Sequence, residues 1–229
     1  MQISLNPALF TTEQELKIGL IHYSKIVLAS SPQMIKGRMQ LYQENLFFEM
    51  QDAPLTERAG IAEWRQLWEA FGADPNEQPH AAESLLRRIA QQSYLSPIQS
   101  GVDLTNFFSL QYEIPVGLHD VAHVDGDISI TLGTEQTMYE GVDGQNVTLT
   151  NILHSADNKG PFGSPYMDSI RTAVSEKTTD ALHIFYIRPS LSIDKAQQLL
   201  AAAGHMFTQV NGGDYQTALL TKDTPTITL

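Results

Sequence analysis

The stretch Val102-Asp103-Leu104-Thr105-Asn106, inside the longer run from Trp64 to Asp127, says more about the fold than any other part of the sequence. Short apolar segments alternate in this run with Gly, Pro, Asp, Thr and Asn, which favour turns and caps. No Lys or Arg follows Arg88 until Lys159. This pattern is typical of a segment that builds a polar site rather than one that only fills a core.

Helical periodicity is concentrated in the first half of the chain. Ser31-Pro32 opens a predicted helix that reaches about Gln51. A second helix ends at Gly72, because glycine commonly follows a helix, and a third is predicted over residues 81–92. The apolar face of the second helix has the 3–4 spacing of one helical side: Ile61, Trp64, Leu67, Trp68 and Phe71. We expect both tryptophans to lie in the core rather than to form a stacking surface for bases.

Strand patterns dominate the second half. Residues 128–132 alternate strictly between apolar and polar, and residues 146–150 are predicted to pair with them or close by. The nearly continuous apolar run 181–187 predicts a central strand. Further strands are predicted at residues 16–21 and near residues 215–220.

One more helix is predicted from Ser192, as its cap, through Ala203, with Gly204 at its end. Helices therefore lie mainly in the N-terminal half and strands mainly in the C-terminal half, which favours the α+β class. We expect one domain over residues 61–229, with residues 1–60 as an N-terminal extension packed on its core.

The chain of 229 residues is acidic, with a formal net charge of −12. Between Arg88 and Lys159 there is no basic residue, against nine acids: Asp103, Glu113, Asp120, Asp125, Asp127, Glu135, Glu140, Asp143 and Asp157. Proteins that bind nucleic acid draw much of their affinity from Lys and Arg that neutralise phosphates. Two interpretations stay open: an ordinary acidic surface, or a region that does not contact a polyanion by charge alone.

Composition excludes several other classes of protein. The chain has no cysteine, which rules out disulfides, thiolate catalysis and Cys-based zinc sites. No run approaches the roughly 18 uninterrupted apolar residues of a transmembrane helix. The segment Met1–Pro7 lacks both the basic and the long apolar region of a signal peptide. We therefore expect a cytoplasmic protein that has no membrane partner.

A series of short motifs resembles one known family. In chain order the motifs are Trp64-Arg65-x-x-Trp68-x-x-Phe71-Gly72-x-x-Pro75, Glu83-Ser84-Leu85-Leu86-Arg87-Arg88-Ile89, Val102-Asp103-Leu104-Thr105-Asn106, Pro115-Val116-Gly117-Leu118-His119-Asp120, Gly126-Asp127-Ile128 and Ser169-x-Arg171-Thr172. Together they resemble the B3/B4 domain of the phenylalanyl-tRNA synthetase β subunit, and more closely a stand-alone relative of it, over about residues 15–205.

This resemblance implies both a fold and a function. The expected fold is a single B3/B4-like domain whose β-rich core contains a closed or strongly curved sheet. In the synthetase the domain is the editing module, which hydrolyses tyrosine wrongly attached to the phenylalanine tRNA. The resemblance therefore implies a pocket for the aminoacyl end of a tRNA.

The resemblance also suggests site residues. Thr105 and Asn106 stand where the family has the Thr-Asn pair of its editing pocket, and a hydroxyl and an amide can hold an aminoacyl group without charge. A capped turn is the open alternative for this pair. Gly117 stands where editing subunits often have the pocket His. His119, two residues later, is the candidate to supply a catalytic imidazole.

A glycine-rich segment could form another wall of this pocket. Gly160, Gly163 and Ser164 are its candidate substrate-binding residues, because their backbone amides could stabilise a developing oxyanion. Arg171 either approaches the pocket or pairs with a carboxylate as a structural residue. His183 lies in an apolar strand pattern and is expected to be a core histidine whose hydrogen bonds are satisfied.

His119 and His123 have the i, i+4 spacing of a two-His metal pair. Pro115 and Gly117 precede them and Gly126 follows, so no helix is expected to present them to one ion. We predict a polar turn, no metal site and no cofactor.

Two functions of different classes follow. The first is a protein that binds the aminoacyl end of tRNA and acts in trans as an aminoacyl-tRNA deacylase on mischarged tRNA. Aminoacylation is not expected, because this length leaves no room for the other synthetase domains. The second is a non-catalytic pocket that binds a free amino acid or small metabolite without tRNA. DNA is a partner in neither. A basic patch beside the pocket would favour the first function, and an acidic rim the second.

Overall fold

The computed structural model describes residues 1–51 and 54–229. Its helices are α1 (Gln33–Glu49), α2 (Ala59–Phe71), α3 (Ala81–Ala90), α4 (Ser100–Tyr112) and α5 (Ile193–Asn211). Its strands are β1 (Gln2–Leu5), β2 (Lys17–Ser24), β3 (Val116–Asp120), β4 (Ile128–Leu132), β5 (Met138–Glu140), β6 (Asn146–Thr148), β7 (Leu153–Asp157), β8 (Gly160–Gly163), β9 (Ala181–Ile187), β10 (Asp214–Leu220) and β11 (Thr226–Thr228). Single turns of 3-10 helix lie between them, among them η4 (Ile170–Thr172).

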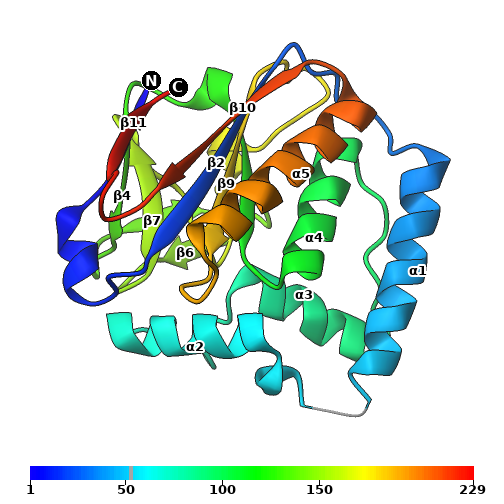
Figure 1. The fold of residues 1–229 in the computed structure, drawn as a ribbon, viewed down its shortest axis with the longest axis horizontal. Coiled ribbons are helices and arrows are strands. Elements are labelled where there is room, and N and C mark those ends of the chain that lie inside the picture. Colours follow the sequence, from blue (N-terminus) through cyan, green and yellow to red (C-terminus); the bar gives the residue numbers. More distant parts are fainter. Residues whose placement is uncertain (52–53) are drawn as a thin grey trace.

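The first helices form as the sequence predicts. Helix α1 begins directly after Pro32, whose fixed φ suits a helix start. Helix α2 ends at Gly72, which has a φ of 88° and whose amide donates to the Glu69 and Trp68 carbonyls. Both tryptophans of α2 are buried in the core, as expected. Figure 1 shows α2 and α3 lying beneath the sheets, with α1 at the outer side of the molecule.

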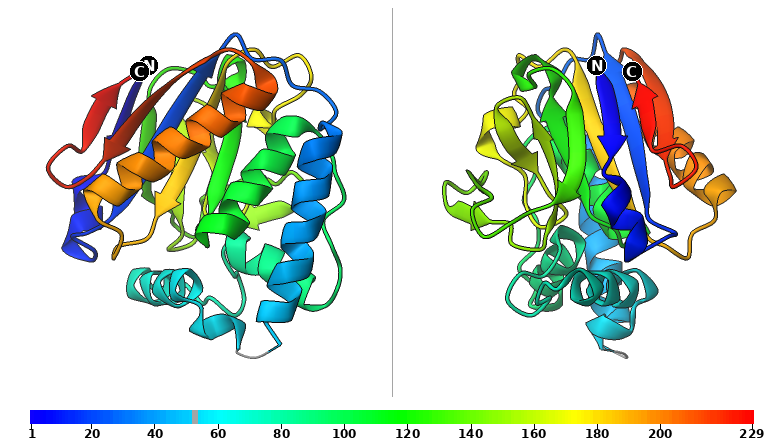
Figure 2. Two further views of the ribbon diagram at one scale, coloured as in Figure 1. Left: turned by 45° about the vertical axis from the view of Figure 1, so that its right-hand side comes forward. Right: turned by 90° about the vertical axis from the view of Figure 1, so that its left-hand side faces the viewer.

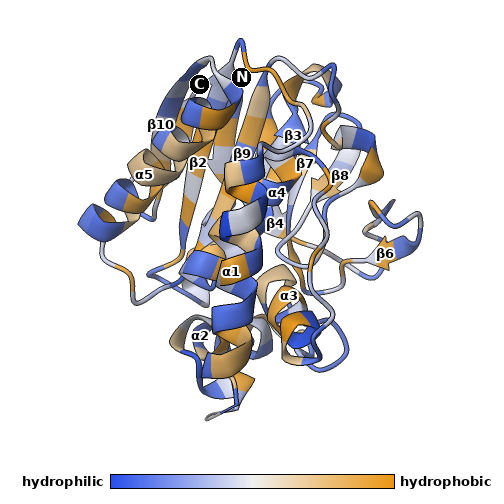
Figure 3. Ribbon diagram, turned by 90° about the vertical axis from the view of Figure 1, so that its right-hand side faces the viewer, coloured by the Kyte–Doolittle hydropathy of each residue, from blue (hydrophilic) through white to orange (hydrophobic). Residues whose placement is uncertain are grey.

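A four-stranded sheet of order β10-β2-β9-β3 forms the centre of the fold. Its strands are all antiparallel, and every residue of β9 is buried, which confirms the predicted central strand. Helices α4 and α5 cover one face of this sheet, where the His183 ring lies 5.9 Å from Phe108 of α4 and 5.1 Å from Phe207 of α5. In Figure 3 the inward-facing parts of the sheet and helices carry hydrophobic colours.

A second sheet of order β11-β1-β4-β7-β8 faces the opposite side of the four-stranded sheet, and β5 and β6 form a separate hairpin (Figure 2). The α+β class is as predicted, but the closed or strongly curved sheet is wrong. In the part of the chain described here, both main sheets are open, with β11 and β8 at the edges of one and β10 and β3 at the edges of the other. The central sheet is covered by helices on one face and by a sheet on the other, so burial does not require closure.

Two local predictions differ from the structure, the first of them only in part. Residues 146–148 pair with β5, and only Thr150 at the end of the predicted strand lies beside β4, where it bridges to Gly133. Helix α5 does not end at Gly204 but continues to Asn211. Gly204 lies under the ring of Tyr215 in β10, and an added Cβ would overlap this ring. The glycine therefore permits a close helix–sheet contact, and Gly212 and Gly213, with φ of 69° and 77°, follow the true end.

The stretch Val102–Asn106 lies within helix α4, not in a turn. Gln99 caps this helix, and its side chain accepts a hydrogen bond from the Gly101 amide. In the predicted N-terminal extension, β2 is paired on both sides, by β10 and β9. The division of the chain at residue 60 stays a prediction. Among residues 1–51 and 54–229, no helix combines the length and the apolar character needed to span a bilayer.

Candidate functional site

Thr105 faces the helix-covered side of the central sheet. Its hydroxyl donates to the Gly101 carbonyl at 2.8 Å and lies 2.8 Å from His183 Nε2. The other ring nitrogen of His183 lies 2.9 Å from the Tyr23 hydroxyl. The prediction that His183 is a satisfied core histidine is confirmed, and Thr105 and Tyr23 are the residues that satisfy it.

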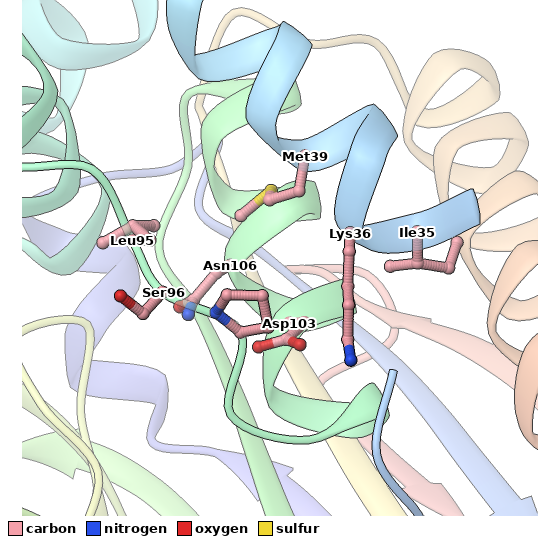
Figure 4. A pocket seen from close by; sticks show the side chains of 8 residues that line it. Ile35, Lys36, Met39, Leu95, Ser96, Asp103 and Asn106 are labelled. Carbon is pink, nitrogen blue, oxygen red and sulfur yellow. The ribbon is translucent and has the colours of Figure 1, made fainter. Parts of the chain in front are cut away.

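Asn106, the next residue, points away from Thr105 into a small crevice between α1 and α4 (Figure 4). The crevice is lined by residues of both helices and of the preceding loop: Ile35, Lys36, Met39, Leu95, Ser96, Pro97, Asp103 and Asn106. Its cavity volume is about 10 Å³, which is room for about one water molecule. The Thr-Asn pair is therefore split between two environments.

His119 and Asp168 lie on the opposite face of the central sheet, between the two sheets. His119 belongs to β3 and is fully buried, whereas the Asp168 side chain, in the loop after β8, is 21 % exposed. His119 Nε2 and Asp168 Oδ1 are 3.6 Å apart, and both atoms are buried without a hydrogen-bond partner. Asp168 Oδ2 accepts from the Leu118 amide at 3.1 Å. The two facing atoms are thus buried, while the Asp168 side chain as a whole is partly exposed.

Two glycines make room for this pair. An added Cβ on Gly117 would come within 2.7 Å of Asp168 Oδ1 and 2.9 Å of His119 Nε2. An added Cβ on Gly163 would come within 2.6 Å of His119 Cε1. Any larger residue at either position would therefore displace the pair. Of the predicted site residues, the structure brings His119, Gly117 and Gly163 together.

The hydrogen bonds of His119 indicate which nitrogen carries its proton. Thr172 Oγ1 lies 3.0 Å from His119 Nδ1 and also donates to the Phe162 carbonyl at 3.5 Å. If the hydroxyl donates to the carbonyl, it accepts from Nδ1–H, which leaves the lone pair on Nε2 facing Asp168. Burial, with a smaller effect from the Arg171 charge, lowers the pKa of His119 to about 3. The imidazole is therefore neutral at physiological pH.

Asp168 responds to the same environment in the opposite way. Burial raises the pKa of Asp168 to about 7, against the lowering effect of the hydrogen bond from Leu118. Near neutral pH this carboxyl exchanges its proton readily. The Asp168 carboxyl can therefore accept and return one proton near pH 7, beside an imidazole nitrogen that stays neutral.

The loop that carries Asp168 is held by Ser164 and Tyr139. Ser164 Oγ accepts from the Tyr166 and Met167 amides and bonds the Tyr139 hydroxyl at 2.8 Å. The Tyr139 hydroxyl also donates to the Met167 carbonyl. The Val142 amide donates to the Asp168 carbonyl at 3.0 Å. In this structure Ser164 orients the loop and does not present a free hydroxyl.

Gly160 and Arg171 lie together at the end of the β7–β8 hairpin. The Arg171 guanidinium makes a bidentate pair with Asp157, at 3.0 and 2.9 Å, and donates to the His123 and Gly160 carbonyls. Burial raises the pKa of Asp157, but the hydrogen bonds from Arg171 and from the Asp125 and Lys159 amides outweigh it, so this pKa lies below its ordinary value. Arg171 therefore pairs with a carboxylate, which is the structural one of its two predicted roles. Its guanidinium links the β7–β8 hairpin to η4.

The proposed pair of His119 and His123 does not converge on one point. His119 points inward, whereas the half-exposed His123 lies 3.9 Å from Asp120. Within residues 1–51 and 54–229, no group of three or more His, Asp or Glu side chains could hold a metal ion.

Sequence reasoning missed Asp168, Tyr186 and Ser155. The Tyr186 hydroxyl on β9 and Ser155 Oγ on β7 are both buried near one another, and neither has a hydrogen-bond partner elsewhere. Burial, together with the Asp168 charge, raises the pKa of Tyr186 well above its ordinary value, so this hydroxyl stays protonated. Tyr186 stands in an otherwise apolar strand, and a polar group at such a position was the signal that could have identified it.

Comparison with known proteins places the chain in a family. The model of the B3/4 domain matches residues 63–209, which is more than half of the chain. The chain belongs to the B3/4 domain family. This membership confirms the resemblance that the short motifs indicated.

Relatives of two kinds share this domain. An uncharacterized Bacillus subtilis protein, YhzB, is 28% identical over 221 residues, which cover 96% of this chain and 100% of that protein. The phenylalanine–tRNA ligase β subunit of Paramagnetospirillum magneticum is 27% identical over 156 residues, 57% of this chain and 20% of the subunit. That of Shewanella oneidensis is 31% identical over 122 residues, 50% of this chain and 14% of the subunit. The chain thus spans only a small part of these ligase subunits.

A solved structure also resembles the chain. It is an N-terminal fragment of the phenylalanyl-tRNA synthetase β subunit from Pyrococcus horikoshii. The match has a TM-score of 0.44 and 10% identity, and it covers 93% of this chain and 49% of that one.

Proposed function

We propose that this B3/4 domain binds the aminoacyl end of tRNA and hydrolyses the ester bond of a mischarged aminoacyl-tRNA in trans. The family and its tRNA-ligase relatives support the choice of substrate. The observation that carries the chemistry is the buried pair of His119 Nε2 and Asp168 Oδ1, which are 3.6 Å apart and otherwise unpaired. An unpaired acceptor of this kind is costly unless it serves a ligand or a water.

The pair has the properties that ester hydrolysis requires. As the oxygen of a water molecule bonds to the ester carbonyl carbon, one water proton passes to ionised Asp168, and the neutral His119 Nε2 accepts a hydrogen bond that orients the water. The same proton then passes to the ribose oxygen when its bond to the carbonyl carbon breaks. A terminal hydroxyl of the tRNA can assist the transfer. The segment 160–164, which comprises strand β8 and Ser164, is the candidate source of backbone donors for the oxyanion.

The test is deacylation of a panel of mischarged tRNAs by the purified protein. Asp168→Asn removes the proton acceptor and His119→Gln removes the imidazole that orients the water, and each is expected to lower the rate about 100-fold or more. Met34→Ala, on the exposed side of α1, is the control that keeps the wild-type rate. Hydrolysis that persists unchanged in both site variants contradicts this proposal.

Asn106→Ala separates two possible locations of the site. If Asn106 lines the substrate pocket, as the family resemblance implies, this variant loses activity. If the His119–Asp168 pair alone forms the centre, the variant keeps its activity, because Asn106 lies in the crevice on the helix side of the sheet. The two outcomes are exclusive, so one variant decides between the two locations.

The charge of the chain supports a second function, the binding of a free amino acid or small metabolite without tRNA. No basic residue lies between Arg88 and Lys159, and Arg171, which is close enough to affect His119, is engaged by Asp157. Phosphates would therefore gain little here. Calorimetric titration with tRNA that carries no amino acid distinguishes the two functions, because only the first function predicts that the protein binds tRNA. Under either function we place the protein in the cytoplasm, where both kinds of ligand occur.

A further inference from the structure

Helix α1 exposes three large apolar side chains along its outer face. Met34, Leu41 and Phe48 are 70%, 60% and 68% exposed and follow one another at steps of seven residues. Seven residues make nearly two helical turns, so these side chains form one stripe. The opposite side of α1 packs into the core, where its buried residues are Ile35, Met39, Gln43 and Leu46. The stripe therefore faces away from the molecule, at whose outer side Figure 1 shows this helix.

The outer face of α1 is arranged symmetrically about Leu41. Met34 and Phe48 lie seven residues before and after it. Arg38 and Glu44, which carry opposite charges, lie three residues before and after it. In a second α1 that runs antiparallel, with a twofold axis at Leu41, each Met34 therefore meets the Phe48 of the other copy. Each Arg38 comes level with the Glu44 of the other copy, so apolar contact and opposite charges coincide in one register.

The charges of α1 favour an antiparallel neighbour. The basic Lys36 and Arg38 lie in its N-terminal half, and the acidic Glu44 and Glu49 lie in its C-terminal half. Because the helix dipole is positive at the N-terminus, this order is the reverse of the one that stabilises a helix alone. An antiparallel copy brings acids beside the basic half and bases beside the acidic half. These charges also cancel within α1, so two chains of net charge −12 can approach through this helix with little local repulsion.

Arg38 and Glu44 keep their charges available for such contacts. The Arg38 guanidinium lies over the ring of Phe107, 5.0 Å from its centroid, and Glu44 accepts a hydrogen bond from Gln40 at 3.1 Å. Within residues 1–51 and 54–229, neither of the two side chains forms a salt bridge. Both side chains are long, so they can meet between paired helices, twice in a symmetric pair.

We infer that the protein forms a symmetric dimer through the outer face of α1, with the two helices antiparallel and Leu41 at the twofold axis. One helix face buries less than the roughly 800 Å² per partner of a standard interface, so the dimer dissociates in the micromolar range. Helix α4 and the central sheet lie between α1 and the pair of His119 and Asp168. The dimer therefore leaves both candidate sites uncovered and does not depend on the proposed hydrolysis.

Sedimentation velocity from about 1 to about 200 µM protein tests the dimer. We expect a shift from monomer to dimer as the concentration rises. Leu41→Glu places two like charges at the axis and should weaken association at least about tenfold. Met138→Glu is the matched control, because Met138 is also exposed, at 51%, but lies on β5. The inference is overturned if the wild type stays monomeric throughout, or if both variants associate alike.

Engineered cysteines test the register, because the chain has none of its own. In oxidised glutathione, Leu41→Cys should form a disulfide-linked dimer faster than Met138→Cys, which measures random collision. Met34→Cys alone should not, because the Met34 of the other copy lies fourteen residues along the helix, about 21 Å away. A mixture of Met34→Cys with Phe48→Cys should cross-link. Equal rates for Leu41→Cys and Met138→Cys, or efficient cross-linking of Met34→Cys alone, would refute the antiparallel dimer.

Discussion

His119 Nε2 faces Asp168 Oδ1 at 3.6 Å, and neither atom has another partner. The two residues come from different parts of the chain, strand β3 and the loop after β8, and the fold brings them together between its two sheets. Burial affects the two pKa values in opposite directions, and this difference leads to the first prediction.

Asp168→Asn is expected to stabilise the protein above pH 7 but not at pH 4. The folded state binds the Asp168 proton more tightly than the unfolded state does, because the pKa is raised from 3.8 to about 7. The free energy of unfolding of the wild type therefore falls relative to that of the variant as the pH rises from 3.8 to about 7. The difference is at most about 4 kcal/mol, at 1.36 kcal/mol per pKa unit. Urea unfolding at pH 4 and pH 8 measures it, and an equal difference at both pH values would contradict the raised pKa.

Gly163→Ala is expected to lower deacylation about tenfold or more, because its Cβ would displace the His119 ring. The added contact should also destabilise the fold by about 1–3 kcal/mol. Gly37→Ala is the matched control, since a Cβ at Gly37, on α1, meets no atom within 4 Å. This control should be as stable as the wild type or more stable, by up to about 1 kcal/mol. Rate assays and thermal melts of both variants are the measurements.

Thr105→Val is expected to destabilise the protein by about 1–3 kcal/mol, because it leaves His183 Nε2 buried without its partner. Thr105→Ser keeps the hydroxyl and should recover most of this stability. Chemical denaturation measures the free energy of unfolding of both variants and of the wild type. If Thr105→Val is as stable as the wild type, then the hydroxyl is not needed for the core, and a role in ligand binding regains support.

Gly204→Ala is expected to destabilise the protein by about 1–3 kcal/mol, although alanine is the better helix former, because the new methyl would overlap the Tyr215 ring. Tyr215→Ala in the same chain should remove the overlap. A double-mutant cycle by thermal unfolding gives the coupling energy. Additive effects of the two changes would show that the ring does not restrict this position.

The sequence predicted elements well where burial imposes a clear hydrophobic pattern. The 3–4 spacing from Ile61 to Phe71 and the apolar run 181–187 are both dictated by burial, and both elements form as predicted. Gly204 was misread because a glycine that ends a helix and a glycine that admits a neighbouring ring are identical in a sequence. Helix α4 was missed for a related reason, since Thr and Asn favour turns on local grounds and tertiary packing overrides them.

The candidate site could be predicted only in part. His119, Gly117 and Gly163 were named beforehand, and the structure places them together. Asp168 was not named, because nothing local distinguishes a carboxylate in a polar loop from the many on the surface. Its importance arises from a contact with a residue 49 positions away in the chain, 168 − 119, which no short motif records.

The N-terminal and C-terminal strands β1 and β11 are hydrogen-bonded neighbours in one sheet, and the Met1 amino group donates to the Leu229 carbonyl at 3.2 Å (Figure 1). A domain whose two termini lie close together can be inserted into a loop of another protein without distorting either fold. The same geometry allows the ends to be joined by a short linker and new ends to be opened elsewhere. Circular permutants that open at an exposed turn should therefore fold, which would make the domain a portable module for fusion proteins.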